Sequence, residues 1–166
     1  MGTKVAVKTS WGNKNKGSFT ISANTLADAL KALQKRNEWG KFDGKIDYDF
    51  DSADGVVTKV NLKPTYTIQM PDWSGYSDAP DKCKKEWDRM WAKLDEHEDG
   101  HRQVHEDTLT DIQDFLKDQE DLSEKQLKSE IAKRLKDMQT NQDKFDTSTG
   151  NGSKKGVELN VAEECQ

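Results

Sequence analysis

The sequence is poor in apolar residues and contains no long hydrophobic run. Apolar residues, counted with Ala, Tyr and Cys, make up 32% of the 166 positions, whereas charged residues make up 34%. Adding the 11 glycines raises the apolar share to about 39%, below the usual ~45–50% of globular domains. The length suits one domain, and its thin core must depend on the five Trp and five Phe residues, because each buries a large area.

These shortages exclude several classes of protein. No apolar stretch approaches the roughly 18–20 residues of a membrane-spanning helix, so we expect no membrane partner. The N-terminal residues lack the apolar stretch of a signal peptide, so no export signal is expected within this sequence. The net charge is 26 − 31 = −5, with both signs interspersed, and the absence of a basic stripe argues against nucleic acid as a partner.

Cysteine and histidine are also scarce. The two cysteines are far apart in the sequence, whereas the three histidines are clustered. Cys83 and Cys165 match no CxxC motif, and the sequence leaves open whether they pair. The only three histidines, His97, His101 and His105, fall within nine residues of one another. The histidine cluster is therefore the first candidate for a functional site.

The first half of the chain is typical of short strands around one helix. Alternation of apolar and polar residues predicts strands, and leucine spacing predicts a helix that Asn24 can cap. The expected strands cover residues 4–8, 18–22, 45–51, 56–62 and 65–70, and the helix covers 25–36. Loops are expected over 12–16, 37–44 and 71–80, and Asp54-Gly55 predicts a hairpin turn.

The second half predicts two long helices. Apolar residues between Asp81 and about Asp118 fall on an arc of roughly 140° at about 100° per residue. A second helix should begin at Ser123, where Ser-Glu-Lys-Gln matches a capping box, and should end near Phe145. A short strand is expected around residues 157–161.

Together these patterns predict an α+β fold. We expect a small twisted sheet, antiparallel or mixed, packed on the long helix and on a second, C-terminal helix. Residues 1–152 should form a single domain, and residues 153–166 a polar C-terminal tail.

Residues 97–101 read HEDGH, which is an HExxH motif. His97 and His101 are one helical turn apart, so both imidazoles can bind one tetrahedral zinc ion. Glu98 lies about 100° round the helix, where it can take a proton from a zinc-bound water that attacks a carbonyl. Both histidines fall within the apolar arc, which favours a metal site over unrelated core histidines. The motif predicts a zinc-dependent peptidase acting on a peptide or protein.

A catalytic zinc site needs a third protein ligand. His105 lies about 12 Å along the helix axis from His97, which is too far for easy sharing of one ion. Asp107 would need a helix-ending glycine at the position of Val104. The open candidates lie in or after the second helix, because a helical hairpin returns toward the histidines: Glu120, Glu124, Glu130 and Asp146.

Gly100 stands inside the predicted long helix and inside the motif. A glycine there costs about 1 kcal/mol relative to alanine. Either it is a tolerated surface glycine, or another segment of the chain approaches closely at this point.

Three stretches together resemble the bacterial family called domain of unknown function 922. They are Met70–Trp73, Trp87–Leu94 leading into residues 97–101, and Phe145–Gly152, and the resemblance covers about residues 18–152. It implies a secreted zinc-dependent protease with a zincin-like fold, in which the HExxH histidines bind zinc. The family's later motif is an aromatic residue and Asp, then Thr, then His-Gly. Phe145, Asp146 and Thr149 match it, and Asn151 stands where the family has His.

On this pattern Asp146 is predicted as the third zinc ligand, as in Asp-ligated zincins, with His105, Glu120 and Asn151 as the alternatives. A histidine ligand lost at position 151 would instead leave a catalytically impaired, zincin-like metal-binding or interaction domain. A helical-hairpin binding protein without metal is a weaker third reading. The family implies a secreted or periplasmic location, and the oligomeric state stays open.

Overall fold

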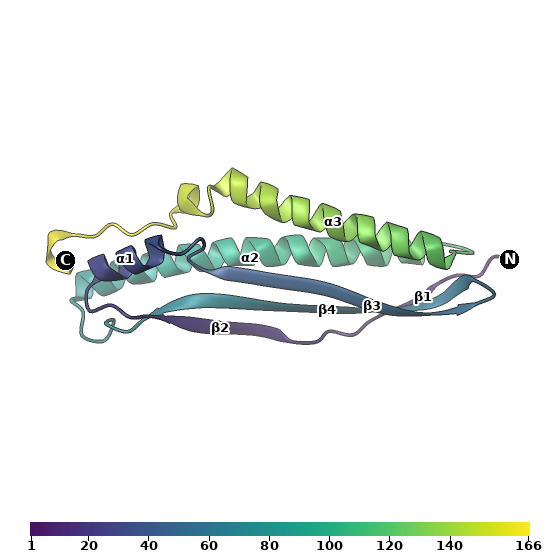
Figure 1. The fold of residues 1–166 in the computed structure, drawn as a ribbon, viewed down its shortest axis with the longest axis horizontal. Helices are drawn as coiled ribbons and strands as arrows, with labels where there is room; N and C mark the ends of the chain where they lie inside the picture. The colour runs from purple at the N-terminus through teal and green to yellow at the C-terminus, as the bar shows by residue number, and fades with distance from the viewer. The chain divides into compact units, whose positions relative to one another are not determined.

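The computed structural model describes residues Met1 to Gln166 and has an α+β fold (Figure 1). Its elements are β1 (Ala6–Thr9), β2 (Lys14–Ile21), α1 (Leu26–Gln34), β3 (Lys41–Ala53), β4 (Val56–Trp73), α2 (Asp81–Lys117) and α3 (Glu124–Thr149). Short 3₁₀ turns follow at Ser153–Lys155 and Glu163–Cys165. The strands form one four-stranded sheet in the order β1-β4-β2, with β3 also paired to β4. None of the helices combines the length and the apolar character that crossing a membrane requires.

The chain folds into two compact units, each assembled from three separate stretches. The first unit comprises Met1–Lys14, Gly44–Tyr66 and Arg102–Lys144, and the second comprises Asn15–Asp43, Thr67–His101 and Phe145–Gln166. The long elements α2, α3, β3 and β4 contribute residues to both units.

The first unit packs strands against two helices. Its core joins residues of α2 and α3, which lie side by side here, to residues of β3 and β4 (Figure 1). The fully buried members are Val57, Val60, Leu62, Ile112, Leu116, Leu127 and Ile131. The helical members are those that the helical periodicity placed on the apolar stripes, so this part of the core follows directly from the sequence pattern.

The strands are longer than the alternating patterns predicted. β2 and β3 begin at Lys14 and Lys41, inside segments that were expected to be loops. β4 is a single strand where two were expected, because Pro64 does not interrupt it. Pro64 has no N–H to donate, but its carbonyl oxygen accepts a hydrogen bond from the N–H of Gly12 at 3.0 Å. Pairing with a neighbour therefore extends strands through residues that lack a strand pattern.

The Asp54-Gly55 turn is confirmed, and it joins β3 to β4. Both residues have positive φ values, 49° and 80°, as a tight hairpin turn of this kind requires. β1, by contrast, pairs with β4 in parallel, from Ala6 opposite Lys59 to Thr9 opposite Leu62. The sheet was predicted to be either antiparallel or mixed. The parallel pairing of β1 with β4 excludes a purely antiparallel sheet.

The helices agree with the predictions except at their ends. α2 spans Asp81–Lys117, as expected. α1 is capped by Thr25 rather than Asn24, because the Thr25 hydroxyl accepts the N–H of Asp28 at 3.2 Å. The predicted capping box of α3 is present, with Ser123 and Gln126 bonding reciprocally to each other's N–H groups. The end near Phe145 was wrong, since α3 continues to Thr149.

The C-terminal segment, residues 156–166, belongs to the second unit and is not the strand predicted at 157–161. Its backbone bonds to side chains of α2 instead of to a strand. Arg89 donates to the carbonyl oxygens of Gly156 and Glu158 at 3.0 and 2.8 Å. The N–H of Asn160 donates to the Glu86 carboxylate at 2.7 Å. A disulfide joins Cys83 at the start of α2 to Cys165, which settles the pairing that the sequence left open.

Loss of this disulfide should destabilise the protein. The bond closes a loop with a sequence separation of 82. The chain-entropy relation gives about 4–5 kcal/mol for such a loop. We expect the double variant Cys83→Ser/Cys165→Ser to unfold at lower urea concentration than the oxidised wild type. The wild type in reductant should unfold at the same midpoint as the variant, and an unchanged midpoint in both would contradict the prediction.

Candidate metal centre

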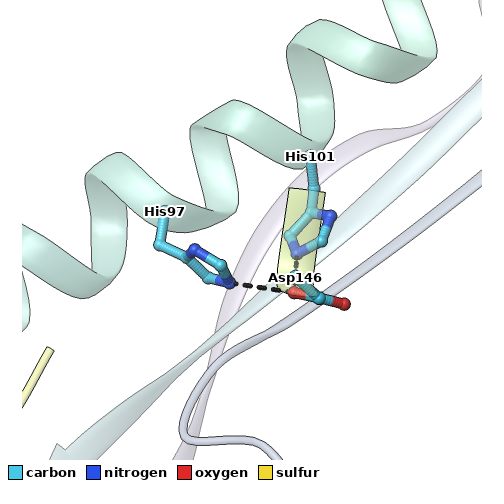
Figure 2. Close-up of side chains that lie close together, drawn as sticks. All are labelled: His97, His101 and Asp146. Carbon is cyan, nitrogen blue, oxygen red and sulfur yellow. Dashed lines mark hydrogen bonds and ion pairs between the residues drawn. The ribbon is translucent and has the colours of Figure 1, made fainter. Parts of the chain in front are cut away.

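The HExxH histidines meet a carboxylate from the end of α3. His97 and His101 project from successive turns of α2 toward Asp146 (Figure 2). One carboxylate oxygen of Asp146, Oδ1, lies 2.9 Å from His101 Nε2 and 3.3 Å from His97 Nε2. Ligand-type atoms of the three residues all lie within 4.8 Å of one another. These three residues form a group that could hold a metal ion.

The separations fit one tetrahedral ion. Ligand atoms bound to zinc at about 2.0–2.1 Å lie about 3.3 Å apart at tetrahedral angles. The two separations from Asp146 Oδ1, 3.3 and 2.9 Å, are close to that value, and all three ligand-type atoms lie within 4.8 Å of one another. The histidine side chains are 6% and 11% exposed, whereas that of Asp146 is 33% exposed, so solvent reaches the group on the Asp146 side. Two imidazoles and a carboxylate, with one side open to solvent, are a set of donors that a metal ion could bind.

The alternative third ligands do not join this group. His105 is fully buried in the first unit, where its Nε2 lies 3.1 Å from the carbonyl oxygen of Lys45. Glu120 forms an ion pair with Lys4 at 3.8 Å. Asn151 contributes through its backbone, because its N–H donates to the carbonyl oxygen of Asp146 at 2.9 Å. Of the further candidates, Glu124 bonds to Ser52 and Glu130 to Arg134.

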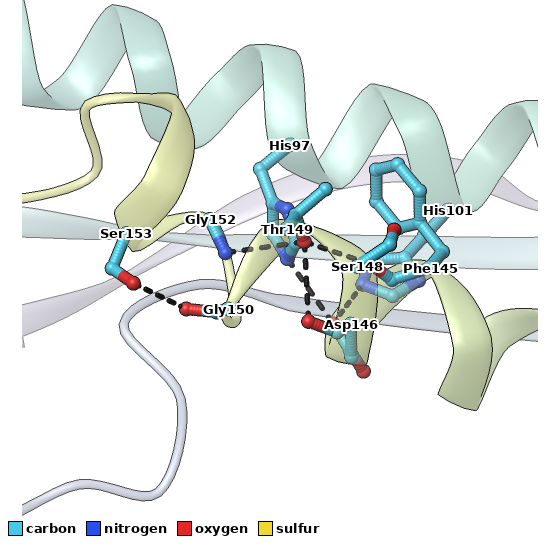
Figure 3. Close-up of polar contacts among 9 residues, drawn as sticks. All are labelled: His97, His101, Phe145, Asp146, Ser148, Thr149, Gly150, Gly152 and Ser153. Atoms are coloured by element: carbon cyan, nitrogen blue, oxygen red, sulfur yellow. Dashed lines mark hydrogen bonds and ion pairs between the residues drawn. The ribbon is translucent and has the colours of Figure 1, made fainter.

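Asp146 lies in the last turn of α3, not just past it, and a hydrogen-bonded turn follows (Figure 3). The Thr149 hydroxyl donates to the carbonyl oxygen of Phe145 at 2.8 Å and accepts the N–H of Gly152 at 3.3 Å. Residues 150–152 all have positive φ, between 52° and 85°. This turn caps the helix and holds the backbone that carries Asp146.

Glu98 is buried beside the group, with 4% of its surface exposed. Its carboxylate accepts a hydrogen bond from the backbone of Phe42. A Cβ at Gly40 would lie 2.7 Å from Glu98 Oε1, so the glycine leaves room for the carboxylate. Burial raises the pKa of Glu98 to about 8, and the negative charges of Glu38 and Asp146 add to the rise. The HExxH motif identifies Glu98 from the sequence, whereas Gly40 and Phe42 belong to no motif that would point to the site.

His97 is held in the neutral state that binds metals. Burial lowers its pKa most, and the neighbouring His101 lowers it further, which together outweigh the opposite effect of the Asp146 carboxylate. Its Nδ1 is buried and has no hydrogen-bond partner. Metal-binding histidines usually donate this second N–H to a carboxylate or carbonyl group. Asp146 contacts the ring at Nε2, but no hydrogen bond orients it from the Nδ1 side.

Comparison with known proteins places the chain in a family. Residues 17–153 match the family described as bacterial protein of unknown function, DUF922. The chain belongs to this family. Its matched residues include His97, Glu98, His101 and Asp146, so the whole group lies within the family region. No curated protein and no solved structure shows significant similarity to the chain.

The raised pKa of Glu98 predicts a pH-dependent stability of the metal-free protein. Unfolded, this carboxyl ionises near 4.5, but folded it keeps its proton up to about 8. The folded state therefore loses stability as pH rises from 4.5 to 8, by a few kcal/mol at roughly 1.4 kcal/mol per pH unit. Glu98→Gln should remove this loss.

Urea unfolding in the presence of a chelator measures the effect. The gain in unfolding free energy from Glu98→Gln should be larger above pH 8 than near pH 5. Glu96→Gln is the matched control, because Glu96 is on the same helix and its side chain is 67% exposed. An equal gain from Glu98→Gln at both pH values would contradict the prediction.

Proposed function

We propose that the protein is a zinc-dependent peptidase with a zincin-like site. His97, His101 and Asp146 would hold the zinc, and Glu98 would act as general base. The convergence of the histidine pair with Asp146, beside a buried glutamate on the same helix, is the observation that carries this proposal. When bound, zinc supplies Lewis acidity, which makes water a better nucleophile at neutral pH and polarises a peptide carbonyl.

Glu98 has the position and surroundings that a proton-transfer role needs. It directly follows His97 on α2, so its carboxylate lies beside the histidine pair without belonging to the ligand group. Accepting a proton from the attacking water requires the ionised carboxylate. Burial raises the pKa of Glu98, whereas the hydrogen bond from Phe42 favours the ionised form, and a cation at the neighbouring ligands would favour it too. Glu98 would then pass that proton to the leaving amine.

The start of β3 provides a place for an extended peptide. β3 begins at Lys41, and its flanking residues Gly40 and Phe42 both contact Glu98. An extended substrate peptide could pair with β3 as an additional strand. Its backbone carbonyls would then lie along β3, starting close to Glu98, the proposed base. A peptide or protein in extended conformation is the substrate class that this arrangement favours.

The disulfide supports a location outside the reducing cytosol. Disulfides persist in oxidising compartments and are rare where thiols are kept reduced. The pairing of Cys83 with Cys165 therefore favours a secreted or periplasmic protein.

A metal-binding domain without peptidase activity is the second candidate. The buried Nδ1 of His97 has no partner, which departs from the usual environment of a catalytic zinc ligand. Asn151, in place of the family's histidine, is the second departure. Both candidates require the metal, and hydrolysis distinguishes them.

Zinc content tests the metal site. Protein purified without chelator should contain about one zinc per chain, and Asp146→Ala should lose most of it because one of the three ligands is gone. Elemental analysis after dialysis measures both values. Asn151→Ala should keep its zinc, since only the backbone of Asn151 contacts Asp146. Fewer than about 0.1 zinc per chain in the wild type would refute the zinc site.

Peptide hydrolysis tests the role of Glu98. Glu98→Gln should retain zinc but lose at least about 100-fold in kcat/KM, because general bases typically contribute 10²–10⁴-fold. A library of quenched fluorescent peptides serves as substrate, and Glu96→Gln on the same helix is the control. Equal hydrolysis by wild type and Glu98→Gln would remove the proposed base. Zinc-loaded wild type that cleaves no peptide would favour the second candidate.

A further inference from the structure

We propose that Phe145 is a positioning residue: its ring, seated on Gly100, holds His97, His101 and Asp146 in metal-binding geometry before a metal binds. The proposal rests on the metal site of the proposed function and deepens it. It assigns a role to Phe145 and Gly100, neither of which has a side chain that can bind a metal ion or transfer a proton.

Three rings pack against one another at the site. The Phe145 ring stacks on His97, with centroids 5.1 Å apart and planes at 19°. It meets His101 edge to face, at 4.9 Å and 80°. The two imidazoles are themselves 4.8 Å apart at 85°. Because each ring contacts the other two, neither imidazole can rotate away without displacing Phe145.

The stack on His97 replaces a missing hydrogen bond. The buried Nδ1 of His97 has no partner, although such a partner is what normally fixes the orientation of a metal-binding imidazole. The nearly parallel ring of Phe145 covers one face of this imidazole. Packing against Phe145 therefore orients the ring in place of the hydrogen bond that Nδ1 lacks.

Gly100 makes room for the Phe145 ring. A Cβ at position 100 would lie 2.2 Å from Phe145 Cζ and 2.9 Å from both Cε atoms, which is far inside van der Waals contact. Glycine weakens a helix relative to alanine, so helix stability alone would favour alanine here. The close approach of the ring explains why the middle of α2 carries a glycine next to His101. Of the two interpretations of Gly100 that the sequence allowed, the structure therefore supports the close approach of another segment.

The ring also fixes the carboxylate, because Phe145 and Asp146 are consecutive. The carbonyl oxygen of Phe145 accepts hydrogen bonds from the hydroxyls of Ser148 and Thr149, at 2.9 and 2.8 Å (Figure 3). The carbonyl oxygen of Asp146 accepts the N–H of Asn151. These bonds restrain the backbone of the pair, so the packing of the Phe145 ring against Gly100 helps to fix the backbone from which Asp146 reaches the histidines.

A double-mutant cycle on metal affinity tests the proposal. The variants are Phe145→Ala, Gly100→Ala and the double variant, titrated with Co²⁺ and Zn²⁺ after removal of bound metal. Each single variant should bind about tenfold or more weakly, in the range that loss of ligand-orienting contacts produces. The double variant should bind no more weakly than Phe145→Ala, because the added Cβ then meets no ring. The visible spectrum of bound Co²⁺ should shift in the single variants, since it reports ligand geometry.

Controls separate positioning from general stability. Phe115→Leu alters a half-buried aromatic residue in the first unit and should lower the melting temperature without changing metal affinity. Phe145→Leu replaces Phe145→Ala if the latter does not fold. Wild-type affinity in Phe145→Ala, or additive losses in the double variant, would overturn the positioning role while leaving the proposed function intact. A wild type that binds neither metal would overturn both.

Discussion

The second unit depends on the contact between one carboxylate and two buried imidazoles. Polar groups taken from water cost free energy unless they find partners, and His97 and His101 are both buried on the face of α2. Asp146 provides the partner at Nε2 of each ring. It is 45 residues beyond His101, so α3 has to end where its last turn faces the histidines. The helix end, the turn at 150–152 and the Phe145 ring all serve that requirement.

The surroundings of this site disfavour charge on two of its side chains when no cation is bound. Burial holds His97 in the neutral form and Glu98 in the protonated form, so it opposes charge on both groups. A divalent cation at Asp146 and the histidines would supply the positive charge that the surroundings lack. The sequence is short of apolar residues and still places polar groups on its best core-facing helix. That choice is easier to understand if ligand binding, and not packing alone, satisfies them.

The sequence predicted what depends on local pattern and missed what depends on distant partners. Periodicity and the Ser123 capping box predicted the body of both long helices, because these signals act within a turn. The end of α3 was missed because the side-chain bonds of Thr149 have no periodic signature. The same holds for the 157–161 segment, whose partners are Arg89 and Glu86, about 70 residues away. The HExxH spacing predicted that the two histidines lie together, and the family pattern predicted Asp146 as their partner. That Asp146 and not Glu120 lies beside them depends on the tertiary arrangement, which no local pattern determines.

The segment that follows Asp146 in the chain is held in place by contacts with α2, as α3 is before it. After the turn at 150–152, Arg89 holds the carbonyls of Gly156 and Glu158, and Cys165 is bonded to Cys83. Arg89 and Cys83 both lie on α2, the helix that carries His97. The segment that carries Asp146 is thus fixed to the helix that carries His97 by packing before Asp146 and by a disulfide and hydrogen bonds after it. A site restrained on both sides loses little conformational entropy on binding, which favours a metal even with only three protein ligands.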